Sequence, residues 1–170
     1  MIAIFSDTHS HRGHELEGAA LSAAREADAV IHAGDFTSAA ALEAFQGECD
    51  RLFAVHGNAD SAAVRDRLPT ARTVERDGIR FAVTHRRDGG ATGLSMFGRS
   101  RDADVVVSGH THRPTLVETD DAVLVNPGSY AQPRGNTPGF AVVESRTDGF
   151  EIELRQPDGT PIDAVERSRE

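Results

Sequence analysis

The sequence predicts an α/β fold in which one sheet carries helices on its outside and packs onto a second sheet within a single domain. Two observations predict it. The first two-thirds of the chain alternate short apolar runs with segments of helical periodicity, and the part after Pro114 reads as strands and turns. A chain of 170 residues is long enough to form one core of ordinary size, so both parts are expected to share it.

The first two-thirds of the chain read as strand and helix units. The opening MIAIFS is a short apolar run that ends in polar residues, as a buried strand does. A stripe of mostly alanine follows, from Leu16 to Ala27, at the spacing of one helix face. The same reasoning predicts strands at 29–33, 52–55, 79–84 and 104–107, and helices around 38–45, 62–68 and 92–101.

The last third is predicted to contain strands only. In its clearest strand, Phe150, Ile152 and Leu154 alternate with charged residues, which is the period of a half-buried strand. The residues from Gln156 onward are polar and are predicted to be loose. We therefore expect a domain over 1–156 and a polar tail over 157–170, with strands in the last third at 116–118, 122–125, 140–143 and 150–154.

The composition excludes several classes of protein. No apolar run approaches the 18 residues that a membrane helix needs, and the N-terminus lacks a signal-peptide pattern. We therefore expect a cytoplasmic protein without a membrane partner. Cys49 is the only cysteine, which excludes an internal disulfide and a metal cluster held by thiolates.

The charge pattern is unusual, because the formal net charge is -9 and all 18 basic residues are arginine. An acidic surface without lysine fits a halophilic protein, since high salt screens its self-repulsion. Biased codon usage explains the missing lysine equally well. With either explanation, the negative field disfavours a role in coating nucleic acid.

Polar motifs follow the predicted strands at the points where those strands end. The motifs lie about 25 residues apart, close to the length of one strand-helix unit, so they should meet at one edge of the sheet. Glycine precedes Asp35, Asn58 and His110 and permits tight turns there. The candidate ligands in these motifs are Asp7, His9, Asp35, Asn58, His85, His110 and His112.

Two carboxylates, one amide and four imidazoles are too polar to share a dry site without compensation. A pair of divalent cations supplies that compensation, and a two-metal site suits in-line displacement at phosphorus. Oxygen and imidazole ligands without sulfur favour Mn, Fe, Co, Ni or Zn. The sequence therefore predicts a site for two divalent ions.

The series Asp7-x-His9, Gly34-Asp35, Gly57-Asn58, His85 and Gly109-His110-x-His112, with Asn126-Pro-Gly-Ser129 beyond it, resembles the calcineurin-like metallophosphoesterases, in particular their small bacterial and archaeal phosphodiesterases. The resemblance implies a four-layer α-β-β-α sandwich of two mixed sheets flanked by helices.

The resemblance also implies how the metals are held. One ion would bind Asp7, His9 and His112, and the other would bind Asn58, His85 and His110, with Asp35 bridging them. A metal-bridging hydroxide would then attack the phosphorus of a small phosphodiester or phosphomonoester, with Asp35 and Asn58 among the catalytic residues. Mn²⁺ is the metal expected first, with Ni²⁺, Co²⁺, Fe²⁺ or Zn²⁺ as alternatives, and relatives of this kind suggest a homodimer.

The sequence departs from the family at two points. Larger phosphatases of the superfamily carry histidine directly after Gly-Asn, where this chain has Ala59, so His11 is a candidate proton donor in its place. Related phosphodiesterases continue with Gly-His after the ligand that corresponds to His85, where this chain has Arg86-Arg87. Arg86 and Arg87 either grip phosphate oxygens or point into solvent and offset the acidic surface, and Arg134 either contacts phosphate or forms a structural salt bridge.

The sequence also allows other interpretations of its histidines and of its function. His32 lies within a strand and is expected to support the site from the core. A non-catalytic binding module is the main alternative, because a trafficking scaffold of the superfamily resembles this fold, although that scaffold lacks part of the ligand set. A nuclease is disfavoured by the acidic charge and by the lack of a basic groove bearing aromatic residues.

Overall fold

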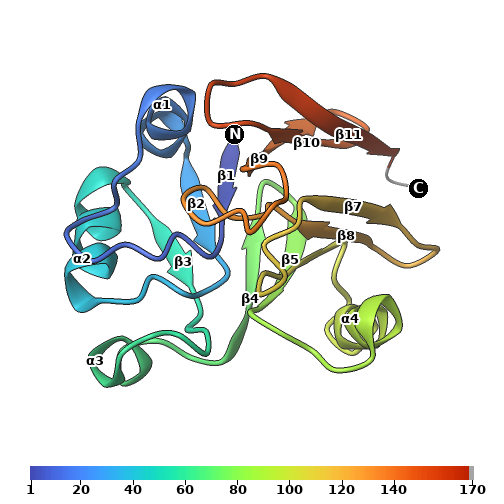
Figure 1. Cartoon of the computed structure of the whole chain (residues 1–170). Helices are drawn as coiled ribbons and strands as arrows, with labels where there is room; N and C mark the ends of the chain where they lie inside the picture. Colours follow the sequence, from blue (N-terminus) through green and yellow to red (C-terminus); the bar gives the residue numbers. More distant parts are fainter. Residues whose placement is uncertain (169–170) are drawn as a thin grey trace.

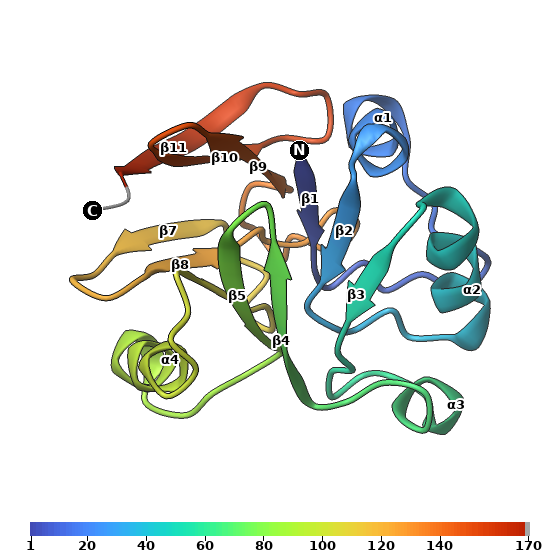
Figure 2. The same cartoon turned by 180° about the vertical axis from the view of Figure 1, so that it is seen from behind.

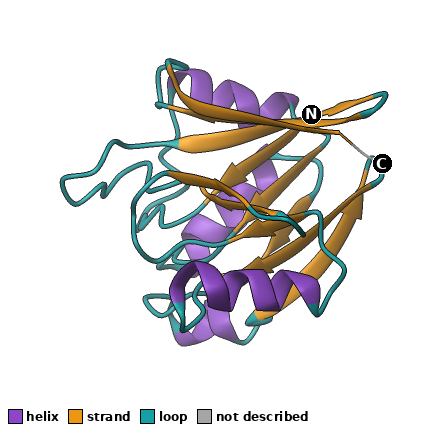
Figure 3. Ribbon diagram, turned by 90° about the vertical axis from the view of Figure 1, so that its right-hand side faces the viewer, coloured by secondary structure: helices purple, strands orange, loops and turns teal. Residues whose placement is uncertain are grey.

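The computed structural model describes residues 1–168 and confirms the α/β class with two mixed sheets. The sheets pack against each other, and helices cover the outer face of each, which produces the four layers α-β-β-α (Figure 1). Turned by 90°, the molecule is seen through its layers, with one helix in front of the strands and the other helices behind them (Figure 3). None of the helices in the described part of the chain has the length and apolar character that a membrane crossing requires.

The first sheet has six strands in the order β11-β10-β9-β1-β2-β3. Its first three strands along the chain are parallel, and its last three are antiparallel additions at one side. Three helices cover its outer face, and they contribute mostly alanine to the contact. The elements are β1 (Ile2–Phe5), α1 (Gly18–Glu26), β2 (Ala29–His32), α2 (Ala39–Glu48), β3 (Leu52–Ala54), α3 (Ala62–Arg65), β9 (Phe140–Arg146), β10 (Gly149–Arg155) and β11 (Pro161–Ser168).

The second sheet has five strands in the order β4-β5-β6-β8-β7. Its three central strands are parallel and its two edge strands are antiparallel to them. One helix, α4, covers its outer face, as the reverse view shows (Figure 2). The elements are β4 (Ala71–Arg76), β5 (Ile79–Thr84), α4 (Gly90–Arg99), β6 (Val105–Val107), β7 (Thr115–Glu118) and β8 (Val123–Asn126).

The main core lies between the two sheets, and strand alternation decides which side chains enter it. In β1, Ile2 and Ile4 point between the sheets, whereas Ala3 and Phe5 point toward the helices. Burying one such aliphatic side chain stabilises the fold by about 1.5–3 kcal/mol. A strand that is buried on both faces reads as a continuous apolar run, which explains why β1 was recognisable in the sequence.

Two strands were missed by the sequence analysis, and the prediction of a loose tail was wrong. β4 buries only Val74, and β11 carries alternating exposed residues, because both are edge strands. β11 pairs with β10, and its Ile162 and Val165 pack against the core between the sheets. Arg167 also donates to the carbonyl oxygens of the turn between β7 and β8. Residues 169–170 of the predicted tail lie outside the described chain.

Candidate metal centre

All seven predicted ligands lie in loops beyond the C-terminal end of a strand. The parallel strands of both sheets point their C-terminal ends to one side, so loops that are distant in sequence converge there. Asp7 and His9 follow β1, Asp35 follows β2, Asn58 follows β3, His85 follows β5, and His110 and His112 follow β6.

The first group of ligands consists of Asp7, His9 and His112, whose ligand atoms lie within 4.8 Å of one another. The Nε2 atoms of His112 and His9 lie 3.2 and 3.8 Å from Asp7 Oδ1. All three side chains are buried or nearly so. A carboxylate and two imidazole nitrogens thus face one small space.

The second group surrounds Asp35 and His85, with Asp7 also within the same 4.8 Å limit. Asp35 Oδ2 lies 3.3 Å from His85 Nε2 and 3.5 Å from His9 Nε2, so it stands between the two groups. Asn58 Oδ1 lies 3.0 Å from His85 Nε2 and 2.9 Å from His110 Nδ1. The structure therefore brings all seven side chains around one centre.

This centre suits divalent metal ions. Among the described residues, Asp7 Oδ1 and His9 Nε2 are buried without a hydrogen-bond partner, although His112 Nε2 lies 3.2 Å from Asp7 Oδ1. A buried carboxylate oxygen and a buried imidazole nitrogen are costly to leave unsatisfied. Oxygen and imidazole donors without sulfur match Mn²⁺, Fe²⁺, Co²⁺, Ni²⁺ or Zn²⁺.

Two backbone carbonyls orient the histidine rings. His85 Nδ1 lies 2.7 Å from the Ala33 carbonyl oxygen, and His112 Nδ1 contacts the carbonyl oxygen of Gln132. Because a carbonyl only accepts, each Nδ1 must carry the proton and donate it. The unprotonated Nε2 of each ring can then face the carboxylates as a metal ligand, which is the usual arrangement of ligating histidine.

The electrostatic field of the centre keeps its carboxylates ionised. Burial opposes ionisation of Asp7, but its contacts with His112 and His9 outweigh burial, and the net pKa of Asp7 is lowered. The pKa of Asp35 is also lowered, because contact with His85 outweighs burial. The pKa of His110 is lowered, chiefly by burial, which favours its neutral, ligating form.

The ligand loops adopt strained backbone. Five of the seven predicted ligands have positive φ, in the left-handed region that residues with a Cβ rarely enter. Such residues persist only where the surrounding structure holds them, and they concentrate at functional sites. Their φ values are 52° at Asp7, 43° at His9, 62° at Asp35, 72° at His110 and 58° at His112.

The glycines of the motifs are required for two different reasons. Gly34 has φ of 97°, as expected for a tight turn. Gly57 and Gly109 do not have positive φ; instead, a Cβ on Gly57 would collide with Asp35 Oδ1, and one on Gly109 would collide with Ser6 Oγ. The expectation of tight turns is therefore correct at Gly34, whereas the other two glycines make room for the ligand loops.

Asp60 holds the loops of the second group, and the sequence analysis missed it. Its buried carboxylate accepts from the backbone N–H groups of Asp35 (2.9 Å), Thr37 (2.7 Å) and Gly57 (2.7 Å). It thereby joins the loop after β2 to the loop after β3. The only signal in the sequence was its place two residues after Asn58.

Ser129 has the corresponding role for the first group. Its hydroxyl donates to the Asp7 carbonyl oxygen (2.6 Å) and accepts from the N–H of Gln132 (2.9 Å), whose carbonyl orients His112. Ser129 is fully buried. The Asn126-Pro-Gly-Ser129 segment thus holds the Asp7 and His112 loops together.

His32 supports the centre from the core, as predicted. Its Nδ1 accepts from the N–H of Gly34 (3.1 Å), so Nε2 carries the proton that is shared with Thr8 Oγ1 at 3.0 Å. The ring stacks on Phe36 with 3.7 Å between centroids. Burial lowers the pKa of His32 to about 3, which keeps the ring neutral while it joins the first two ligand loops.

The remaining predicted residues belong to neither of the two ligand groups. His11 is exposed and, within the described chain, belongs neither to a ligand group nor to the lining of the two hollows described below. Arg86 is paired with Asp88 at 3.3 Å, and the Arg87 guanidinium lies 4.3 Å from the centre of the Phe97 ring. Arg134 is exposed, and its charge lowers the pKa of His112 against the larger effect of Asp7.

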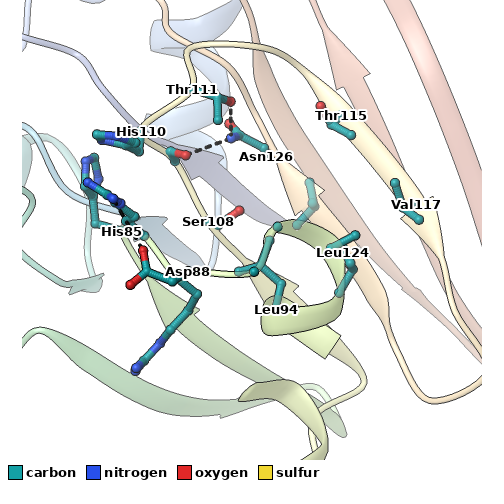
Figure 4. Close-up of a pocket in the computed structure, with 17 residues that line it drawn as sticks. His85, Asp88, Leu94, Ser108, His110, Thr111, Thr115, Val117, Leu124 and Asn126 are labelled. Carbon is teal, nitrogen blue, oxygen red and sulfur yellow. Dashed lines mark hydrogen bonds and ion pairs between the residues drawn. The ribbon is translucent and has the colours of Figure 1, made fainter. Parts of the chain in front are cut away.

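Two hollows open beside the centre, and His85, Arg86 and Arg87 line both. The first, of about 390 Å³, extends from His85 and His110 toward α4, β7 and β8 (Figure 4). The second, of about 410 Å³, lies on the side of Asn58. Both are within the size range of small-molecule sites.

Comparison with known sequences identifies relatives over most of the chain. A sequence model described as the calcineurin-like phosphoesterase superfamily domain matches residues 1–148. A probable metallophosphoesterase of Methanothermobacter thermautotrophicus is 32% identical, with 90% of this chain and 89% of that protein covered. A phosphodiesterase of Methanocaldococcus jannaschii is 30% identical, with 75% of this chain and 82% of that protein covered.

Solved structures share the fold. A predicted phosphoesterase of Streptococcus pneumoniae superimposes with a TM-score of 0.77 at 24% identity, over 99% of this chain and 97% of that one. Vacuolar protein sorting 29 of Cryptosporidium parvum superimposes with a TM-score of 0.83 at 18% identity, over 99% of this chain and 97% of that one. At these identities the likeness establishes the four-layer arrangement alone.

Proposed function

This chain belongs to the calcineurin-like phosphoesterase superfamily, and from that premise we propose that it is a hydrolase that uses two divalent metal ions to cleave phosphate esters, with a phosphodiester preferred. The phosphodiesterase of M. jannaschii supports the preference for a diester. Mn²⁺ is the metal that we propose first. The observation that carries the proposal is the convergence of seven oxygen and nitrogen ligands around Asp7 Oδ1 and Asp35 Oδ2.

The proposed division of the ligands follows their distances. Asp7, His9 and His112 would hold one ion, and Asn58, His85 and His110 would hold the other. Asp35 would contact both ions, because its Oδ2 lies between His9 and His85. Its Oδ1 accepts from the N–H of Ala59 at 2.8 Å, which fixes the direction in which Oδ2 points.

Two bound ions would supply Lewis acidity toward a phosphate oxygen and a water activated at neutral pH. The residues of the chain contribute position and charge. The carboxylates of Asp7 and Asp35 stay ionised, and the orientation of His85 by the Ala33 carbonyl keeps its Nε2 facing them. Such preorganised charge needs no rearrangement during reaction, which is how electrostatic catalysis lowers a barrier.

We propose Arg86 as the first arginine to contact substrate phosphate. It lines both hollows beside His85, and its partner Asp88 is exposed, so their ion pair is weak and exchangeable. Arg87 lines the same hollows but is held over Phe97, and Arg134 lies on the His112 side. These two arginines are proposed to contribute positive potential rather than direct hydrogen bonds.

A non-catalytic binding module is the second candidate function. The fold likeness to vacuolar protein sorting 29 favours it. The full set of seven ligand positions favours the hydrolase, because a binding surface does not require two buried side-chain atoms without partners.

The test compares chelator-treated protein with protein supplied with Mn²⁺, in molar salt, on bis-p-nitrophenyl phosphate and p-nitrophenyl phosphate. We expect Mn²⁺ to restore turnover, with the diester cleaved faster than the monoester. Asp35→Asn should lower the restored turnover roughly 10²-fold to 10³-fold. Calorimetry counts the bound ions in parallel. Protein that binds two ions but cleaves neither ester would favour the binding module.

A further inference from the structure

The hollow between the centre and α4 has an apolar wall. Leu94 of α4, Val117 of β7 and Leu124 of β8 form this wall, at the end away from His85 and His110 (Figure 4). Apart from the two histidines, the charged groups of its lining are Arg86, Arg87 and Asp88, which all belong to the loop after β5. The hollow therefore changes from charged near the metal centre to apolar at its far end.

Val117 is unusual among the described side chains. It is one of two large hydrophobic residues that stay exposed, and 37% of it is accessible to solvent. The other, Met96, is 67% exposed on α4 and does not line the hollow. An exposed valine at the rim of a hollow of about 390 Å³ gains free energy if an apolar group displaces the water beside it.

The second hollow differs in chemistry. His56, Asn58, Arg65 and Thr70 contribute to its lining, and apart from Gly57 every residue that lines it has a polar or charged side chain. The two hollows meet at His85, Arg86 and Arg87. A phosphodiester has two ester substituents on one phosphorus, so a phosphate bound at the centre can direct one substituent into each hollow.

We propose that the hollow bounded by Leu94, Val117 and Leu124 is a subsite for an aliphatic substituent of the phosphate ester. This inference rests on the proposed function, because it places the phosphate at the metal centre. An aliphatic group fits better than a nucleobase, since no phenylalanine, tyrosine or tryptophan lines the hollow to stack on a base. The preferred substrate class is then a phosphodiester with one alkyl group and one polar group.

The test uses two diesters with the same leaving group, hexyl p-nitrophenyl phosphate and methyl p-nitrophenyl phosphate. Each buried methylene favours binding about fourfold, so the Mn²⁺-loaded protein should prefer the hexyl ester in kcat/KM by roughly tenfold or more, even with partial burial. Val117→Asp should abolish this preference and leave the methyl ester unaffected. If Val117→Asp folds poorly, a second variant tests the subsite. Ala91→Phe places a large side chain on the exposed first turn of α4, where Ala91 lines the hollow, and should also abolish the preference for the hexyl ester.

Met96→Asp is the matched control, because it makes the same kind of change on α4 outside the hollow. It should keep the hexyl preference. Equal kcat/KM for both esters in the unmodified protein, or a preference that survives Val117→Asp and Ala91→Phe, overturns the subsite while the hydrolase stands. If neither ester is cleaved, the proposed hydrolase fails. Calorimetry with hexylphosphonate and methylphosphonate then tests the subsite without turnover. Binding of hexylphosphonate that is roughly tenfold tighter supports the subsite, and equal binding of the two phosphonates overturns it.

Discussion

The two ligand groups of the centre come from the same kind of loop but differ in burial. Asp7 and His112 of the first group are almost fully buried; in the second group His85 is buried as well, whereas Asn58 is exposed and His110 is half-buried. Ser129 lies fully buried against the first group, where it is bonded to the Asp7 carbonyl. The second group faces the two hollows instead. If the proposed centre binds two ions, we expect the first group to hold its ion more tightly and the second group to exchange its ion and to face the substrate.

Replacing one ligand in each group should give the largest effects and should separate the two groups most clearly. Asp7→Asn should lower Mn²⁺-dependent turnover roughly 10³-fold, because a buried ligand close to both groups loses its charge. Asn58→Ala should cost roughly 10-fold to 100-fold, and raised Mn²⁺ should recover most of it, since the exposed site can refill. The measurement is turnover against Mn²⁺ concentration. Full recovery of Asp7→Asn at high Mn²⁺ would show that the groups do not differ as proposed.

Replacing the supporting residues Asp60 and Ser129 should give effects of intermediate size, one in each ligand group. Asp60→Ala leaves backbone N–H groups of Asp35, Thr37 and Gly57 without their acceptor, so the free energy of unfolding should fall by about 3 kcal/mol. Ser129→Ala removes one hydroxyl and should lower it by about 1–2 kcal/mol. Urea unfolding of the metal-free proteins measures both changes.

Metal affinity then separates the two supports. Asp60→Asn keeps one acceptor oxygen and controls for the loss of the whole side chain. Asp60→Ala should weaken the ion of the second group more than that of the first, and Ser129→Ala should do the reverse, each by roughly 10-fold to 100-fold. Equal weakening of both ions by either variant would argue that the loops form one unit.

His11 is expected to give the smallest effect. Because its side chain is exposed and lies outside the ligand groups and both hollows, His11→Ala should change turnover less than about threefold, below the range of a general acid. The comparison of a methyl ester with a p-nitrophenyl ester is decisive, because a proton donor matters most for the poor leaving group. A loss confined to the methyl ester would restore the role of His11 as the acid.

The strands that position the centre could be predicted because they are buried on both faces. β1 and β6 are continuous apolar runs, β2 is one up to its last residue, His32, and each strand is followed by a ligand motif. β4 and β11 escaped prediction because an edge strand needs few apolar residues, such as Val74, Ile162 and Val165. Their identity depends on the neighbouring strand, which periodicity along the chain does not report.

The ligand residues could be predicted from motif and spacing, whereas their supports could not. Asp60 and Ser129 act through backbone groups of residues that are distant in sequence, and an isolated Asp or Ser carries no sign of such partners. The two hollows also escaped prediction, since the first depends on how α4 lies against β7 and β8, and the second on how the loop after β3 lies beside the loop after β5. The roles of Arg86, Arg87 and Arg134 stay predictions for the same reason.

The left-handed backbone at five ligands has a consequence for how this protein can evolve. Each non-glycine residue in that region costs about 1–2 kcal/mol, and glycine at the same position relieves the cost. Mutations such as Asp35→Gly or His110→Gly therefore relieve strain while they remove a ligand. Selection for thermal stability alone favours an inert protein, so a lineage that keeps all five side chains is one in which the metal centre is under selection.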